Sequence, residues 1–89
     1  MPYDWNPDKN ASNLAKHEVG FEAVQKFDWA TSLVQADMRN SPVEVRLITL
    51  GAIGTQVHVL VFTIRRNATW IISLRRANRK EAARYASQA

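Results

Sequence analysis

Arginines within and at the ends of three predicted strands are the side chains of this sequence best suited to chemistry on a phosphate. Arg46 interrupts an otherwise apolar run, and Arg65 and Arg75 end the next two. A guanidinium offers fixed donors that match phosphate oxygens, and it stabilises negative charge that develops on phosphorus in a transition state. Because guanidiniums repel one another, a cluster of them on one side of a sheet would favour a bound anion. Solvated arginines at strand ends are the competing interpretation.

The last third of the chain is strongly basic. Residues 61–89 contain seven Lys or Arg and one Asp or Glu, whereas residues 1–60 contain five and seven. This asymmetry favours a polyanionic partner such as RNA, although a basic helix can also dock on an acidic protein. Arg79 and Arg84, on the last predicted helix, are either a phosphate-binding face or a solvated helix surface.

The two histidines give a second candidate chemistry, proton transfer. His17 follows Lys16 at the end of a predicted helix, where positive charge is favoured by the helix dipole, and an imidazole changes protonation near neutral pH. A role in proton transfer and a favourable positive charge at the helix end explain the position of His17 equally well. His58 lies in an apolar strand and is expected to be half-buried and bonded to a neighbour. The histidines lack metal-ligand spacing and the chain has no cysteine, so we expect no metal and no other cofactor.

An N-terminal strand and two helices are expected to position the Lys-His pair. Residues 3–5 alternate like an edge strand, and Asn6 and Pro7 are typical of a helix start, which predicts a helix over 7–17. We expect it to pack through a narrow stripe that includes Ala11, Leu14 and Ala15. A second, short amphipathic helix is predicted from apolar residues at helical spacing, namely Phe21, Val24 and Phe27.

The rest of the chain predicts an antiparallel meander followed by a helix. A strand is expected around 32–35, and three longer strands at 43–51, 57–64 and 69–75, with turns at 51–55 and 65–68. Alternation in the last strand would place Trp70, Ile72 and Leu74 on one face and Ile71, Ser73 and Arg75 on the other.

A capping box marks the last helix. Asn78 followed by Glu81 predicts a helix over 78–87, with Glu81, Arg84 and Tyr85 near one another. The fold class is therefore α+β, with two N-terminal helices, a β-meander and a C-terminal helix. The length of 89 residues indicates a single domain over 1–89, and no apolar run could span a bilayer or serve as a secretion signal, so we expect a cytoplasmic protein with no membrane partner.

Four separated motifs give the sequence a resemblance to the BrnT family of bacterial type II toxins. They are YDWNPDK at 3–9, NLAKHEV at 13–19 with FEA at 21–23, RLITLG at 46–51, and IISLRRA at 71–77 with Glu81 and Tyr85. The resemblance implies a RelE-like fold and a ribonuclease that arrests translation and growth. It also implies a cognate BrnA-type antitoxin with a ribbon-helix-helix domain, assembled with the toxin as a heterotetramer that binds promoter DNA through the antitoxin.

The resemblance implies a set of site residues in this chain. The expected catalytic residues are His17, Arg46, Arg65, Arg75 and Tyr85. The expected RNA-binding residues are Lys16, Ser73, Arg76, Arg79, Glu81 and Arg84. The family often has acidic residues where this chain has Val45 and Ile64, a charged residue at Trp70, and alanine at Leu74. These departures add apolar surface beside the expected site.

Cleavage of RNA without a metal fits these residues. Attack of a ribose 2′-hydroxyl on the adjacent phosphate needs a base, a proton donor for the leaving 5′-oxygen, and cations for the charge on phosphorus. His17 or Tyr85 would transfer protons, and the three strand arginines would surround the phosphate. Two alternatives stay open: a nucleic-acid-binding module without catalysis, and an inactive relative that binds the antitoxin as a co-repressor.

Overall fold

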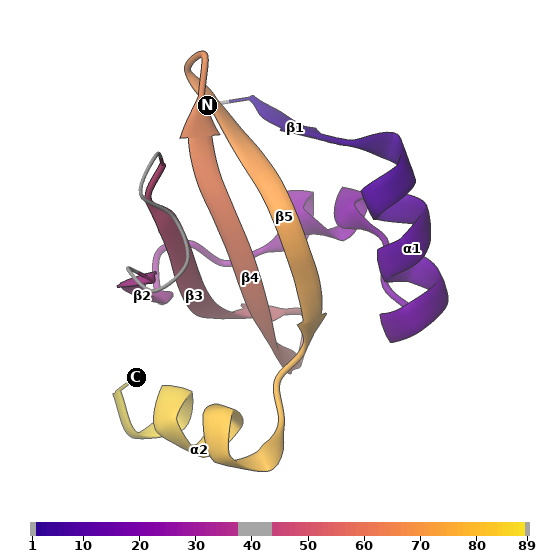
Figure 1. The fold of residues 1–89 in the computed structure, drawn as a ribbon. Helices are drawn as coiled ribbons and strands as arrows, with labels where there is room; N and C mark the ends of the chain where they lie inside the picture. The colour runs from indigo at the N-terminus through magenta and orange to yellow at the C-terminus, as the bar shows by residue number, and fades with distance from the viewer. Residues whose placement is uncertain (1, 38–43, 89) are drawn as a thin grey trace.

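A computed structural model describes residues 2–37 and 44–88 of the chain, which form an α+β fold (Figure 1). One sheet contains five strands in the order β1-β5-β4-β3-β2. The elements in chain order are β1 (Tyr3–Trp5), α1 (Pro7–His17), the 3₁₀ helix η1 (Phe21–Lys26), β2 (Leu33–Asp37), β3 (Arg46–Ile53), β4 (Gln56–Arg65), β5 (Ala68–Arg76) and α2 (Arg79–Gln88).

The predicted three-strand antiparallel meander is confirmed and β2 extends it at one edge, but the sheet is mixed. Strands β2 to β5 pair antiparallel with their neighbours, whereas β1 pairs parallel with β5. The two predicted N-terminal helices are one α-helix and one 3₁₀ helix. The expected start of a strand at Val43 lies outside the described residues, and β3 begins at Arg46.

The core lies on one face of the sheet, beneath η1. Phe21 and Val24 are fully buried, as their spacing predicts, and they pack with Leu60, Phe62 and Leu74. Figure 1 shows η1 behind the sheet, with α1 beside β5 and α2 beyond the ends of the strands. On the opposite face of the sheet Leu50 and Val59 pair with each other and are buried as well, and α2 contacts β3 and β4.

That opposite face carries the strand arginines. Leu47 pairs with Phe62 and both pack on the core, so Arg46 and Arg65, an odd number of positions away, point to the other side. Arg75 pairs with Val59, the neighbour of core residue Leu60, and points to that side too. We call this side the arginine face. The predicted gathering of Arg46, Arg65 and Arg75 on one side of the sheet agrees with this register.

Gly51 lies inside β3 and not in the predicted turn. A Cβ at this position would collide with the ring of Phe27, so the glycine allows the ring to pack directly on the strand. The reversal comes later, at Gly54, whose φ of 63° suits glycine. The predicted turn after β4 is confirmed, because Arg66 and Asn67 both adopt positive φ, as a two-residue hairpin turn requires.

Helix α1 begins as predicted but packs differently. The Asn6 side chain accepts hydrogen bonds from the backbone N–H groups of Asp8 and Lys9, which caps the helix. The predicted apolar stripe is wrong: Leu14 is 53% exposed, and Ala11 and Ala15 are exposed as well.

Asn13 is the residue that joins α1 to the sheet. It is 8% exposed, and its amide nitrogen donates to the carbonyl oxygens of Leu74 (2.7 Å) and Val19 (3.0 Å). Its side-chain oxygen accepts from the Leu74 N–H at 3.3 Å. Strand β1 pairs with β5 only from Thr69 to Ile71, so Asn13 supplies the polar partner that the backbone of β5 lacks further along.

Strand β5 contains a bulge that overturns its predicted alternation. Val61 pairs with Ser73 and Phe62 with Ile71, which leaves Ile72 as an extra residue. As a result Ile71 and Leu74 both enter the core, although simple alternation places them on opposite faces. The bulge turns Ile72 and Ser73 toward the same pocket beside α1.

The capping box of α2 is confirmed. The Glu81 N–H donates to Asn78 Oδ1 at 2.8 Å, and the Asn78 N–H donates to Glu81 Oε1 at 2.9 Å. Tyr85 and Arg84 tie the helix to the β2 region through Thr31 (2.8 Å) and Gln35 (3.0 Å). None of the helices in the described ranges is long and apolar enough to cross a membrane.

Candidate functional site

Two adjoining pockets form a groove along the junction of α1 and β5. The first, about 190 Å³, is lined by residues that include Arg46, Arg65 and Trp70, and the second, about 170 Å³, by residues that include Lys16 and His17. Both are also lined by Lys9 and Ile72, which join them. We call the combined feature the basic groove. Its polar lining includes Lys9, Lys16, His17, Arg46, Arg65 and Ser73, together with one carboxylate, that of Glu44.

Arg46 lines the groove and has a hydrogen-bond donor without a partner among the described residues. Its Nε atom is buried and has no hydrogen-bond partner among the described residues. A buried donor without a partner costs free energy, and a guanidinium keeps its charge at any physiological pH. An anion that accepts this N–H would remove the penalty, which makes Arg46 the clearest anion-binding candidate in the groove.

Arg65 is held in one orientation by two neighbours. Glu44 accepts from its Nη2 at 2.7 Å and from its Nε at 3.1 Å, and the Trp70 ring lies 4.9 Å from its Cζ. Hydrogen bonding to Arg65 lowers the pKa of Glu44. The family resemblance implies an acidic residue at position 45, where this chain has Val45. Glu44 is the residue just before it, so the chain keeps a carboxylate beside Arg65. Trp70 is half-buried against Arg65 and lies outside the core.

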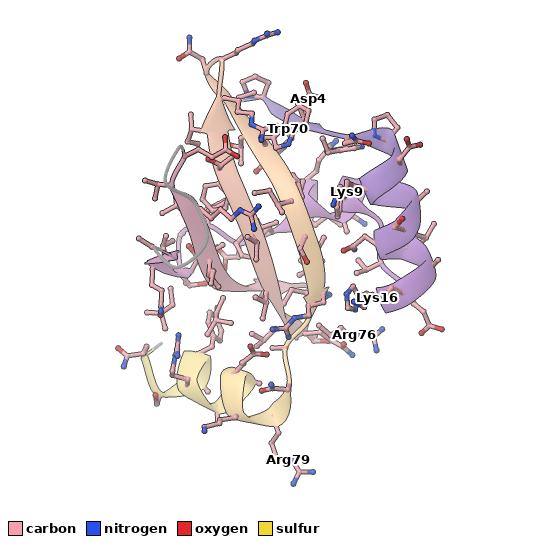
Figure 2. The ribbon with its side chains drawn as sticks, in the orientation of Figure 1. Asp4, Lys9, Lys16, Trp70, Arg76 and Arg79 are labelled. Carbon is pink, nitrogen blue, oxygen red and sulfur yellow. The ribbon has the colours of Figure 1, made fainter. Side chains whose placement is uncertain are left out.

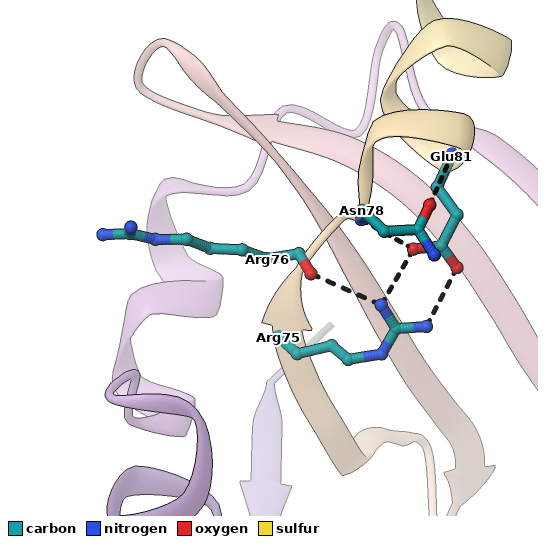
Figure 3. A network of polar contacts seen from close by, with 4 residues as sticks. All are labelled: Arg75, Arg76, Asn78 and Glu81. Carbon is teal, nitrogen blue, oxygen red and sulfur yellow. Dashed lines mark hydrogen bonds and ion pairs between the residues drawn. The ribbon is translucent and has the colours of Figure 1, made fainter.

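Arg75 is paired with α2. Its Nη1 and Nη2 donate to Glu81 Oε1 (2.8 Å) and Oε2 (2.9 Å), and its Nη1 also reaches the carbonyl oxygen of Arg76 (Figure 3). The hydrogen bond from Arg75 is the main cause that lowers the pKa of Glu81 to about 2. Glu81 is therefore an ionised partner at neutral pH that orients Arg75 and caps α2.

The arginines do not surround one point on the sheet. Arg75 lies opposite Val59 of β4, whereas Arg65 ends β4. The two positions on β4 are six residue steps apart, about 20 Å of extended chain. Arg46 lines the pocket that Arg65 lines, and Arg75 does not line either pocket of the basic groove. Arg46 and Arg65 therefore share a pocket that Arg75 does not line, and the expectation that all three surround one phosphate does not fit this spacing.

The other expected site residues divide between α1 and α2. Lys16, His17 and Ser73 come together in the second pocket. Tyr85 lies on α2 and is bonded to Thr31, which precedes the edge strand β2, whereas His17 lines a pocket with residues of β5. Arg84 is hydrogen-bonded to Gln35.

The remaining arginines of the C-terminal region lie at the surface. Arg76 and Arg79 are exposed, and Arg79 points away from the sheet (Figure 2). His58 is 5% exposed, and its Nδ1 lies 3.0 Å from the carbonyl oxygen of Gln56, so it is more buried than expected and bonded to a neighbour as predicted.

Lys9 is the groove residue that the sequence did not single out. It lies on the side of α1 that faces β5, as Lys16 does (Figure 2). The two lysines are seven positions apart, which places them on one face of a helix, and this spacing is the signal that could have identified Lys9. Within residues 2–37 and 44–88, no group of three histidine, aspartate or glutamate side chains could hold a metal ion.

The four departures from the family pattern fall into three environments. Val45 and Ile64 are about half exposed, at 50% and 46%. Leu74 is fully buried in the core, where its larger side chain fills space. Trp70 lines the basic groove itself. Of these four residues, only Trp70 lines the groove.

The Glu81–Arg75 pair should make stability depend on pH. The folded-state pKa of Glu81, about 2, is below its ordinary value of 4.5, so its contribution to stability is present above pH 4.5 and is lost as the pH falls toward 2. Because the pair is partly solvated, we expect Glu81→Gln to cost only about 1 kcal/mol at pH 6. Urea unfolding should show this difference from the wild type shrinking between pH 5 and pH 2.

Glu18 provides the matched control for this titration. Its side chain is exposed at the end of α1, so Glu18→Gln should change neither stability nor its pH dependence. A Glu81→Gln difference that is the same at pH 6 and pH 2 would contradict the ion pair as its source.

The geometry defines a small α+β protein with a cationic groove that suits a phosphodiester chain. The match to known families is more specific: residues 5–81 match the model of the ribonuclease toxin BrnT of type II toxin-antitoxin systems. The chain therefore belongs to the BrnT family, which carries a ribonuclease role and an antitoxin partner. No curated protein matched the chain.

Proposed function

We propose that this chain is a RelE-like endoribonuclease that cleaves RNA in the basic groove without a metal ion. The observation that carries the proposal is the buried, unpartnered Nε of Arg46 in the same pocket as Arg65, whose orientation Glu44 and Trp70 fix. Two guanidiniums at one pocket supply the positive charge that a pentacoordinate phosphorus requires in the transition state.

In the proposed reaction the 2′-oxygen of a ribose attacks the adjacent phosphorus. A P–O2′ bond forms and the P–O5′ bond breaks, which leaves a 2′,3′-cyclic phosphate and a 5′-hydroxyl. Arg46 and Arg65 contact the non-bridging oxygens. A base removes the proton from the 2′-hydroxyl, and an acid protonates the leaving 5′-oxygen.

His17 is the proposed proton-transfer group. It lines the groove next to Ser73, whereas Tyr85 is bonded to Thr31 beside α2, which favours His17 over Tyr85. Lys9 and Lys16 line the groove on the α1 side, where their charges would hold phosphates that flank the scissile one. Arg75, held by Glu81, would contact RNA only beyond the groove.

We further propose that a BrnA-type ribbon-helix-helix antitoxin neutralises the chain in the cytoplasm, as a heterotetramer that binds promoter DNA through the antitoxin. The positive groove would be covered by acidic side chains of the antitoxin, because opposite potentials across an interface stabilise the complex. Arg46 would then be shielded from RNA in the complex.

The test is incubation of purified chain with RNA in buffer that contains EDTA. We expect cleavage into fragments at an unchanged rate when the chelator is added. Intact RNA together with strongly salt-dependent binding would contradict the proposal and would favour a binding module without catalysis.

A further inference from the structure

A third cavity adjoins the basic groove across the contact between Arg65 and Trp70. It measures about 390 Å³ and is lined by Asp4, Arg65, Arg66, Ala68 and Trp70. Arg65 and Trp70 also line the basic groove. A group bound in this cavity, which we call the Asp4 cavity, would therefore lie next to a phosphate bound by Arg65.

Asp4 and Trp70 lie side by side at its wall. Strand β1 runs parallel to β5 with Asp4 directly opposite Trp70, and Figure 2 shows the two residues together at the end of the sheet. The ring of Trp70 is half-buried and holds the Arg65 guanidinium at 4.9 Å. An aromatic ring beside a phosphate-binding cation is the arrangement that lets proteins stack a nucleobase next to its own backbone.

The Asp4 carboxylate is free to accept further hydrogen bonds. Its Oδ1 accepts from the Trp5 N–H at 2.8 Å, and the described residues show no ion pair to Asp4, although Arg65 and Arg66 line the same cavity. An ionised carboxylate accepts hydrogen bonds and donates none. It would repel a phosphate, so the cavity suits a ligand group that carries N–H donors.

Guanine is the base that presents such donors to a carboxylate. Its Watson–Crick edge carries two adjacent donors, N1–H and the N2 amino group. Adenine and cytosine place a ring-nitrogen acceptor beside their amino group, and uracil flanks its N3–H with carbonyl acceptors, so each would face the second carboxylate oxygen unfavourably. Recognition of single-stranded RNA commonly combines stacking with contacts to this edge.

We propose that the Asp4 cavity binds a guanine base of the RNA substrate, with Trp70 stacking on the base and Asp4 accepting from its N1–H and N2 amino groups. This inference rests on the proposed function and deepens it, because it makes the groove selective for RNA with guanine at one position beside the phosphate that Arg46 and Arg65 contact.

The test is binding of guanosine, inosine and adenosine 3′,5′-bisphosphates to the purified chain, measured by calorimetry. Guanosine should bind about tenfold more tightly than adenosine, which lies within the discrimination of about 1 to 3 kcal/mol that a bidentate base contact gives. Inosine, which lacks the N2 amino group, should lie between them. Asp4→Asn should bring the ratio of guanosine to adenosine affinity close to one, and the exposed-site control Asp8→Asn should keep the wild-type ratio.

Trp70 variants separate stacking from base selection. Trp70→Ala should weaken binding of all three nucleotides about tenfold, as loss of one base–aromatic stack does, and Trp70→Phe should restore most of the affinity. Equal affinity for guanosine and adenosine, or a guanosine preference that survives Asp4→Asn, would overturn the inference. Because binding is measured without cleavage, a chain that prefers guanosine and leaves RNA intact would contradict the proposed function alone.

Discussion

Replacing Arg46 with alanine is expected to lower the rate of RNA cleavage about 100- to 1,000-fold, the loss typical of one preorganised donor to a developing oxyanion. The Nε of Arg46 has no partner among the described residues and Arg46 lines the same pocket as Arg65, so a phosphate oxygen bound there would be its acceptor. The same observation predicts that stability is unchanged or slightly raised, because the variant removes an unsatisfied buried donor. Cleavage of a labelled RNA and thermal unfolding would measure both effects.

Two further variants make the Arg46 result specific. Arg46→Lys keeps the charge but loses the planar fork, so its cleavage rate should lie between those of the wild type and Arg46→Ala. Lys26→Ala removes an exposed cation at the end of η1, outside the basic groove, and it should cleave at nearly the wild-type rate. Wild-type cleavage by Arg46→Ala, or a larger loss in Lys26→Ala, would place the reaction outside the basic groove.

Replacing Asn13 with alanine is expected to reduce the free energy of unfolding by about 2 to 4 kcal/mol, because three hydrogen bonds are lost and buried backbone groups keep no partner. The partners are the N–H and C=O of Leu74 and the carbonyl oxygen of Val19. For a chain of this size the melting temperature should fall by about 10 to 25 °C. Urea unfolding followed by circular dichroism would measure the change.

The neighbouring residue is the control for Asn13. Leu14 is 53% exposed, so Leu14→Ala should change stability by no more than about 0.5 kcal/mol. If the sequence-based expectation were right and α1 packed through Leu14, the order of the two effects would be reversed. A larger loss in Leu14→Ala than in Asn13→Ala would therefore contradict the docking of α1 described above.

The features that could be predicted from sequence are those set by local interactions. The start of α1 at Asn6 and Pro7, the capping box of Asn78 and Glu81, and the turn at 65–68 each depend on residues within a few positions of one another. All the residues that form each feature lie in one short stretch of chain, so each can be recognised from the sequence alone.

The features that could not be predicted depend on contacts far apart in sequence. Asn13 is buried because β1 is too short to pair with all of β5, and neither strand shows this alone. The bulge at Ile72 changes which residues reach the core, and nothing in the apolar pattern marks it. A strand pattern gives alternation, whereas a bulge is set by how two strands fit.

The residues of the candidate site also divide into those that could be predicted from the sequence and those that could not. Arg46 and Arg65 could be chosen as phosphate ligands from their type and their positions in the strands. Arg65 pairs with Glu44, and Arg75 pairs with Glu81. These ion pairs decide which arginines share a pocket, and they depend on how β3, β4 and α2 lie relative to one another. Lys9 was missed because its role comes from the docking of α1 and not from its neighbours in sequence.

The chemical identity of the ends of RNA fragments produced in the presence of EDTA tests directly whether the 2′-hydroxyl is the nucleophile. We expect a 2′,3′-cyclic phosphate on one fragment and a 5′-hydroxyl on the other, detected by mass spectrometry, and no cleavage at a position where the ribose is replaced by 2′-deoxyribose. Fragments that carry 5′-phosphate and 3′-hydroxyl ends would contradict this expectation, because water and not the 2′-hydroxyl would then be the nucleophile.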